Sequence, residues 1–177
     1  MSFDLGEYAY VFAAKRYIDS VFPGRHTLVT GDSTTTIPKY EEQVAHRMKN
    51  PDTAPPLRFD FIFIDGGHQN DIPMKDILNS QRLAAGANTV VAIDDICRHP
   101  ERHAHYTIEP TKAWAQMVRE GVISEDGFDD YYEIMQRENI TNDDCKVRGM
   151  AWGQYCLSSD ASLIDNSSSL QRLRYNY

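Results

Sequence analysis

The chain has few cysteines and no long apolar run. Its 177 residues include three cysteines, an odd number at irregular spacing: Cys97, Cys145 and Cys156. This pattern does not suit a disulfide framework and predicts reduced thiols in the cytosol. No apolar stretch approaches the ~20 residues that a transmembrane helix needs. Residues 1–4 carry neither the basic nor the apolar segment of a secretory signal, so we expect a cytoplasmic protein with no membrane partner.

Positive charge is also scarce. The chain has 18 Lys and Arg residues against 26 Asp and Glu residues, and its formal net charge is −8. Nucleic-acid binding needs a basic face, so nucleic acid is not the expected partner. Hydrophobic residues make up 41% of the chain, the balance of a globular protein. We expect one domain over residues 1–157, followed by a poorly ordered, serine-rich tail over residues 158–177.

Short apolar runs alternate with helical patterns along the chain. This alternation predicts an α/β fold with a mostly parallel sheet and right-handed crossovers. The apolar run over residues 59–64 predicts a strand covered on both faces. The expected strands span residues 2–5, 26–30, 59–64, 89–93, 131–135 and 150–157. The expected helices span residues 8–22, 37–48 and 71–85 and surround residues 113–118, with a loop over residues 50–56.

Acidic residues end the expected strands of the alternating part. In parallel sheets the ligand binds at the carboxyl ends of the strands, so these acids are candidate binding residues. Asp4 can accept hydrogen bonds from a ribose diol, or it can serve as a helix cap. Asp32 and Ser33 can contact an adenine edge, and the same residues form a good helix-capping sequence. The two roles are compatible, because the cap uses one side chain and the ligand another.

Three further acids form a candidate metal site. Asp65 follows the 59–64 strand, and Asp94 and Asp95 follow the 89–93 strand. Adjacent parallel strands lie about 4.8 Å apart, so these carboxylates would crowd one another unless a cation neutralised them. Such an oxygen set suits Mg²⁺ or another hard divalent ion. The alternative is that one acid faces away and caps the next helix.

Histidines supply two further hypotheses. His68 lies three residues after Asp65 and can act as a general base, because its ordinary pKa is near neutrality. It can equally be a surface histidine. A second cluster contains zinc-ligand residue types but lacks a second ligand pair, so we interpret it as a solvated loop. This cluster comprises Cys97, His99, His103 and His105.

Four motifs, taken in order, resemble class I S-adenosylmethionine-dependent methyltransferases. They span residues 2–4, 31–33, 59–68 and 91–95. The chain is most similar to the small-molecule group related to catechol O-methyltransferase and to methyltransferase-domain proteins with an Asp-Gly-x-His motif. The resemblance covers residues 2–157. It implies a Rossmann-like three-layer sandwich that ends in an antiparallel strand pair, and methyl transfer to an oxygen or nitrogen of a small molecule.

The resemblance also implies roles for single residues. Asp4 holds the place of the acid that binds the cofactor ribose, and Asp32 and Ser33 match residues that contact adenine. Asp65, Asp94 and Asp95 match the metal ligands of the metal-dependent members, and Asp65 also borders the cofactor. His68 stands where the catechol enzymes carry a lysine base. Its role as the base therefore assumes that a histidine can remove the proton in place of the lysine.

The N-terminal end of the chain departs from the family pattern. The family's first strand and glycine-rich loop precede the ribose acid, whereas three residues precede Asp4 and no Gly-x-Gly occurs. The family order places that strand between the second and the fourth. We therefore expect a fragment or an abandoned cofactor site, with weak or no cofactor binding. The 2–5 strand should pair with the 59–64 strand or leave a gap.

Two other functions remain open at this point. A non-catalytic binding or interaction domain would keep the sheet and lose the chemistry, and the missing glycine loop favours it. A Rossmann-like oxidoreductase or sugar-nucleotide enzyme is disfavoured, because it too needs a glycine-rich turn.

Overall fold

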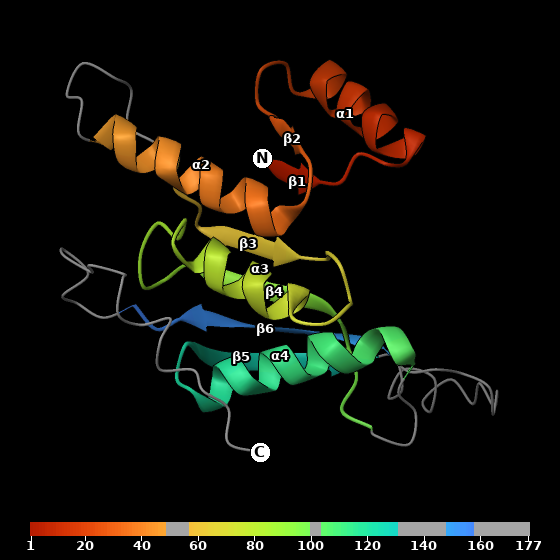
Figure 1. Ribbon diagram of the computed structural model, residues 1–177, viewed down its shortest axis with the longest axis vertical. Helices are drawn as coiled ribbons and strands as arrows, with labels where there is room; N and C mark the ends of the chain where they lie inside the picture. Colours follow the sequence, from red (N-terminus) through yellow and green to blue (C-terminus); the bar gives the residue numbers. More distant parts are fainter. Residues whose placement is uncertain (49–56, 100–103, 131–147, 158–177) are drawn as a thin grey trace.

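The computed structural model describes residues 1–48, 57–99, 104–130 and 148–157. Within these residues the chain is an α/β fold with two sheets (Figure 1). In chain order the elements are β1 (Ser2–Asp4), α1 (Ala9–Val21), β2 (Leu28–Thr30), α2 (Ser33–Met48), β3 (Phe61–Ile64), α3 (Ile72–Gln81), β4 (Val90–Ile96), η2 (His105–Thr107), α4 (Ile108–Arg119), β5 (Ile123–Asp130) and β6 (Gly149–Tyr155). None of the helices within these ranges has the length and apolar character needed to cross a bilayer.

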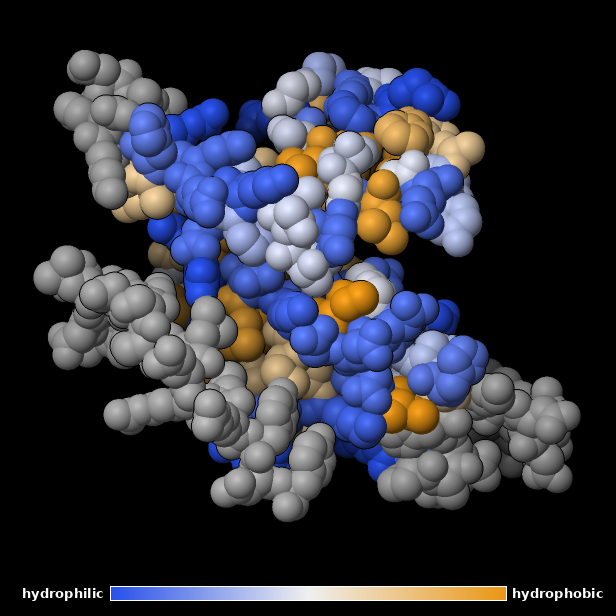
Figure 2. All heavy atoms as spheres, viewed as in Figure 1, coloured by the Kyte–Doolittle hydropathy of each residue, from blue (hydrophilic) through white to orange (hydrophobic). Residues whose placement is uncertain are grey.

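The smaller sheet consists of β1 and β2. The two strands run parallel, with Phe3 opposite Val29, and α1 connects them. No residue of α1 is buried, and several of its large apolar side chains are exposed. Figure 2 shows such apolar side chains at the surface over α1 and the turn before it.

The larger sheet has the order β3-β4-β6-β5. β3 and β4 pair in parallel, and β6 is antiparallel to both β4 and β5. β5 therefore runs parallel to β3 and β4, with β6 inserted between β4 and β5. We expected an antiparallel pair between strands at residues 131–135 and 150–157; the described antiparallel pair at the C-terminal end is instead formed by β5 and β6.

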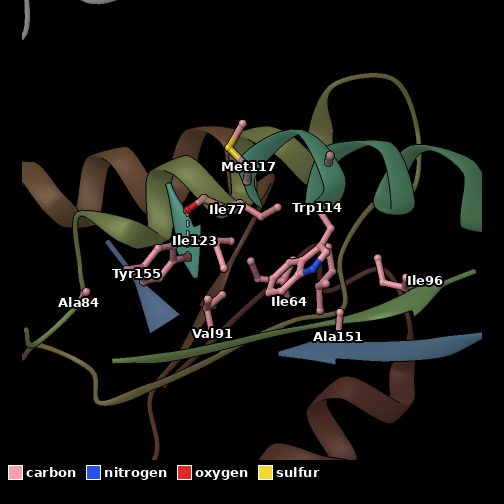
Figure 3. Packing of buried hydrophobic residues seen from close by; sticks show 12 residues of the cluster. Ile64, Ile77, Ala84, Val91, Ile96, Trp114, Met117, Ile123, Ala151 and Tyr155 are labelled. Atoms are coloured by element: carbon pink, nitrogen blue, oxygen red, sulfur yellow. Dashed lines mark hydrogen bonds between the residues drawn. The ribbon is translucent and has the colours of Figure 1, made fainter. Parts of the chain in front are cut away.

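The main core lies between the larger sheet and helices α3 and α4, which cover the same face of it (Figure 3). Ile77 of α3 and Trp114 of α4 pack against Val91 of β4, and each is at most 2% exposed. Burying a side chain of this size stabilises the fold by about 1.5–3 kcal/mol. Tyr155 of β6 donates a hydrogen bond to the Ile77 carbonyl at 3.0 Å, and burial raises the pKa of its phenol.

β3 is less covered than its apolar sequence predicts. Phe61 and Phe63 are 61% and 48% exposed, so the expectation of a strand buried on both faces is wrong. The reason is that side chains alternate between the two faces of a strand: Ile64 faces the core with α3 and α4, whereas Phe61 and Phe63 lie on the other face. β1 does not pair with β3, so the structure has the gap between the 2–5 and 59–64 strands, one of the two expected arrangements.

Several element boundaries differ from the sequence-based expectation: α3 ends at Gln81 rather than residue 85, and two further differences bear on the site. Helix α2 begins at Ser33 rather than Ile37, because Asp32 accepts hydrogen bonds at its first turn, and Pro38 consequently lies inside the helix. Strand β4 continues to Ile96, so Asp94 and Asp95 lie within it rather than after it.

The final strands also need a correction. β5 covers residues 123–130, a polar stretch for which we expected no strand. The strand expected at residues 131–135 lies outside the described residues, as do the 50–56 loop and the 158–177 tail.

Candidate functional site

Three side chains that could hold a cation meet where β3 and β4 end. Asp65 and His68 lie in the turn after β3, and Asp95 lies near the end of β4. Each offers one ligand atom, and these atoms all lie within 4.8 Å of one another. Two carboxylate oxygens and one imidazole nitrogen suit a divalent ion, with Mg²⁺ and Mn²⁺ favoured by the carboxylates and Zn²⁺ by the imidazole.

A bulge in β4 directs Asp95 toward this cluster. The register between β4 and β6 shifts between Ile93 and Ile96, and Asp95 has a positive φ of 57°. The Asp95 backbone N–H donates to Asp94 Oδ1 at 2.8 Å, which supports this uncommon conformation. Residues held in this left-handed region cost about 1–3 kcal/mol and are concentrated at functional sites, as are β-bulges.

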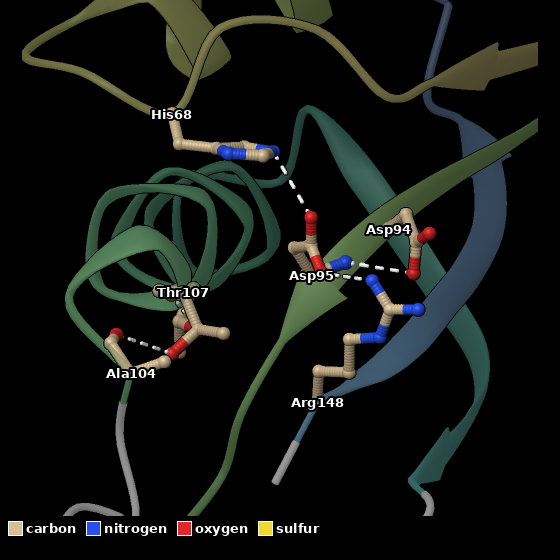
Figure 4. Close-up of polar contacts among 7 residues, drawn as sticks. His68, Asp94, Asp95, Ala104, Thr107 and Arg148 are labelled. Atoms are coloured by element: carbon tan, nitrogen blue, oxygen red, sulfur yellow. Dashed lines mark hydrogen bonds and ion pairs between the residues drawn. The ribbon is translucent and has the colours of Figure 1, made fainter. Parts of the chain in front are cut away.

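Asp95 is buried and has two cationic or ionisable partners (Figure 4). His68 Nε2 lies 3.1 Å from one carboxylate oxygen, and an Arg148 guanidinium nitrogen lies 3.4 Å from the other. The His68 ring also lies 6.0 Å from the ring of Tyr106. Sequence reasoning did not identify Arg148 or Tyr106, because no motif marks either residue.

Electrostatics at the cluster favour a bound cation. Partial desolvation raises the pKa of Asp65, and the negative charges of Asp94 and Asp95 raise it further. An ionised Asp65 is therefore disfavoured by its surroundings, and a divalent ion would relieve that repulsion.

Asp94 does not join the three converging side chains. It is near enough to affect Asp65, but its carboxylate accepts the backbone hydrogen bond of Asp95. Of the three predicted metal ligands, the structure brings together Asp65 and Asp95 and adds His68.

The glycines after Asp65 allow close packing at the cluster. A Cβ on Gly66 would lie 2.7 Å from Asp76 Oδ2, and a Cβ on Gly67 would lie 3.1 Å from a methyl carbon of Ile72. Small residues at both positions therefore let the turn lie directly against α3.

The residues assigned to ribose and adenine have local structural partners. Asp4 Oδ1 accepts the Gly6 backbone N–H at 2.7 Å. Asp32 Oδ1 accepts both the backbone N–H and the hydroxyl of Thr34 at 2.8 Å, and these bonds lower the pKa of Asp32. The capping role of Asp32 is thus present, and its remaining carboxylate oxygen could still face a ligand.

Ser33 and Asp65 line a single cavity of about 430 Å³ between β1 and β3. The Ser33 hydroxyl also hydrogen-bonds the carboxyl group of Asp76. Asp4 and Asp32 are not part of the cavity lining. The structure therefore brings two of the four predicted cofactor residues together.

The histidine-rich segment forms no metal-ligand group among its described members. Cys97 is buried, and its Sγ donates to the His99 carbonyl oxygen at 3.4 Å. His105 belongs to η2, and His103 lies outside the described residues.

Comparisons with known proteins gave no match among family models, curated proteins or solved structures.

Proposed function

We propose that this chain is a methyltransferase domain that uses S-adenosylmethionine and a divalent cation to methylate a small molecule. The observation that carries the proposal is the convergence of Asp65, His68 and Asp95 where two parallel strands end. Ligands of open parallel sheets bind at that edge. The charge cluster there has the residue types that hold a cation and move a proton.

The arrangement of strands supports the proposal. β1 and β2 are parallel, and in the larger sheet β6 is antiparallel among parallel strands. The described sheets are mixed, with two parallel and two antiparallel strand pairs. The Rossmann-like methyltransferase resemblance likewise implies parallel strands together with an antiparallel pairing at the C-terminal end.

Each residue of the cluster has a proposed role. Asp65 and Asp95 hold the cation, and His68 removes a proton from the acceptor. A bound divalent cation supplies positive charge that lowers the pKa of an acceptor hydroxyl. Asp95 also orients the His68 imidazole through its 3.1 Å contact. Asp4, Asp32 and Ser33 contact the ribose and adenine of the cofactor, and the fold aligns acceptor and methyl group.

The cation part of the proposal predicts a defined set of affinities. We expect Mg²⁺ or Mn²⁺ to bind the chain in calorimetric titrations, and Asp65→Asn or Asp95→Asn to weaken binding at least tenfold. Asp126→Asn is the matched control, because Asp126 is exposed on β5, outside the cluster. Absence of binding to the unmodified chain would refute the cation site.

Two further variants separate the roles within the site. Asp94→Ala should leave the affinity within about threefold if Asp65 and Asp95 are the ligands. His68→Ala should keep cation binding if His68 is a base, whereas loss of binding would make it the third ligand and favour Zn²⁺.

The cofactor part predicts weak binding of S-adenosylmethionine and S-adenosylhomocysteine. Few polar residues are available to hold them, and ordering the ligand costs several kcal/mol. We expect saturation-transfer NMR to detect both compounds, with Asp4→Ala reducing both signals. Asp19→Ala serves as the control for a lost carboxylate, because Asp19 is a half-buried residue of α1 that pairs with Lys15. Detecting neither compound would favour the non-catalytic binding domain described below.

A non-catalytic binding domain is the second candidate. It is favoured by the contacts of Asp95, because His68 and Arg148 can balance its charge without a metal. This alternative predicts no heat with divalent ions and no binding of either nucleoside.

A further inference from the structure

Two unpaired strand edges border the cavity between the two sheets. β1 pairs with β2 and β3 pairs with β4, and the cavity of about 430 Å³ is lined by residues of both β1 and β3. We refer to it as the β1–β3 groove and define it by Phe3, Ile37, Phe61, Phe63 and Asp76. In Figure 1, β1 lies on the side of β3 opposite β4, and the two strands point the same way.

The hydrogen bonds to β2 show which groups of β1 face the groove. Ser2 donates to Thr27, and the Asp4 carbonyl accepts from Gly31, so Ser2 and Asp4 face β2. Backbone groups alternate between the two sides of a strand. The N–H and carbonyl groups of Phe3 therefore face away from β2, toward the groove.

The same reasoning applies to β3. The Asp60 carbonyl accepts the Val90 N–H, so the backbone groups of Asp60 and Ile62 point to β4. Those of Phe61 and Phe63 consequently point away from β4. Each edge thus presents backbone donors and acceptors without a strand partner in the described chain, and such edges pair readily with an added strand.

The groove also has apolar walls and one unmet hydrogen-bond acceptor. Phe61 and Phe63 are exposed, although both belong to an apolar strand. Asp76 is 4% exposed, and its Oδ1 has no hydrogen-bond partner among the described residues. Buried carboxylate oxygens are normally hydrogen-bonded, so a ligand that fills the groove should place an N–H donor within reach of Asp76 Oδ1.

We infer that the β1–β3 groove binds one extended, apolar peptide strand of a partner polypeptide. A strand supplies backbone groups to both edges, apolar side chains to cover Phe61 and Phe63, and an N–H group within reach of Asp76. A small amine would satisfy Asp76 and leave both edges unpaired.

The test uses a fluorescein-labelled peptide with the sequence Lys-Val-Ile-Val-Ile-Gly-Lys, blocked at both ends. We expect it to bind with a micromolar dissociation constant in fluorescence polarisation. The same peptide N-methylated at alternate residues has equal charge and a somewhat larger apolar surface but cannot pair with both edges, and it should bind at least tenfold more weakly. Phe61→Ala should weaken binding about tenfold.

Phe22→Ala is the matched protein control, because Phe22 is 59% exposed on another surface and Phe61 is 61% exposed. It should leave the affinity unchanged. Hydrogen exchange should slow at the Phe3, Phe61 and Phe63 amides when the peptide is bound. Equal binding of the N-methylated peptide, or no binding at 1 mM peptide, would overturn the inference. Displacement of the peptide by butylammonium would overturn it in favour of a small amine as the ligand. A dimer that excludes the peptide would overturn it in favour of a second copy of the chain.

Discussion

Replacing Asp76 with asparagine should raise the free energy of unfolding by about 3 kcal/mol at pH 7.5. Burial raises the pKa of Asp76 to about 6, and the negative charge of Asp32 adds to the effect. The unfolded chain has the ordinary value of 3.8, and a shift of about two units corresponds to about 3 kcal/mol. Asparagine keeps the shape and can still accept the Ser33 hydrogen bond, but it carries no charge.

The sign of the pH dependence distinguishes this explanation from a packing effect. The folded chain binds the Asp76 proton more tightly than the unfolded chain does, so the destabilisation is full above about pH 6. It decreases as the pH falls from 6 and nearly vanishes near pH 3.5. The gain from Asp76→Asn should vanish over the same interval.

The stability gain of Asp76→Asn can be measured by urea unfolding at pH 7.5 and pH 3.5, with the fluorescence of the buried Trp114 as the signal. Asp71→Asn on the same helix is the control, because the Asp71 side chain is 56% exposed and pairs with Lys75 at the surface. It should change stability by less than about 0.5 kcal/mol at either pH. A gain from Asp76→Asn that is equal at both pH values would contradict the charge-burial explanation.

Replacing Gly153 with alanine should destabilise the chain by about 3 kcal/mol. Gly153 is buried in β6 between β4 and β5. An added Cβ would lie 2.2 Å from the Ser124 carbonyl oxygen and 2.9 Å from the Glu125 Cα. Both are backbone atoms, so relief requires β5 to shift, and overpacking of this kind costs about 1–3 kcal/mol or more.

Thermal unfolding gives the readout for Gly153→Ala. For a chain of this size, a loss of 3 kcal/mol lowers the Tm by about 6–12 °C. Gly86→Ala is the matched substitution, because a Cβ there meets no atom within 4 Å. It should leave the Tm nearly unchanged. Equal effects of the two substitutions would mean that the β5–β6 contact tolerates a side chain.

The sequence predicts strands well where local pattern and tertiary position agree. The apolar runs that form β3 and β4 were predicted as strands. The approach of Asp65 to Asp95 was also predicted, because parallel strands end at the same edge of a sheet. The exposure of Phe61 and Phe63 was not expected, because it depends on which face of the sheet α3 and α4 cover.

Non-local pairing explains the other differences. β5 is a polar stretch whose strand conformation depends on β6, where the indole of Trp152 lies over Gly127. Arg148 reaches Asp95 because Gly149 pairs with Ile96. The left-handed conformation of Asp95 follows from the bulge in the same pairing, and no local pattern in the sequence specifies it.

The position of β6 determines the order in which the larger sheet can assemble on the ribosome. β5 leaves the exit tunnel before β6, although in the finished sheet β6 separates it from β4. At ordinary translation rates the delay is on the order of seconds. Until residues 149–155 emerge, the edge of β4 that receives β6 lacks this partner, and the nascent chain exposes an aggregation-prone strand edge for that time.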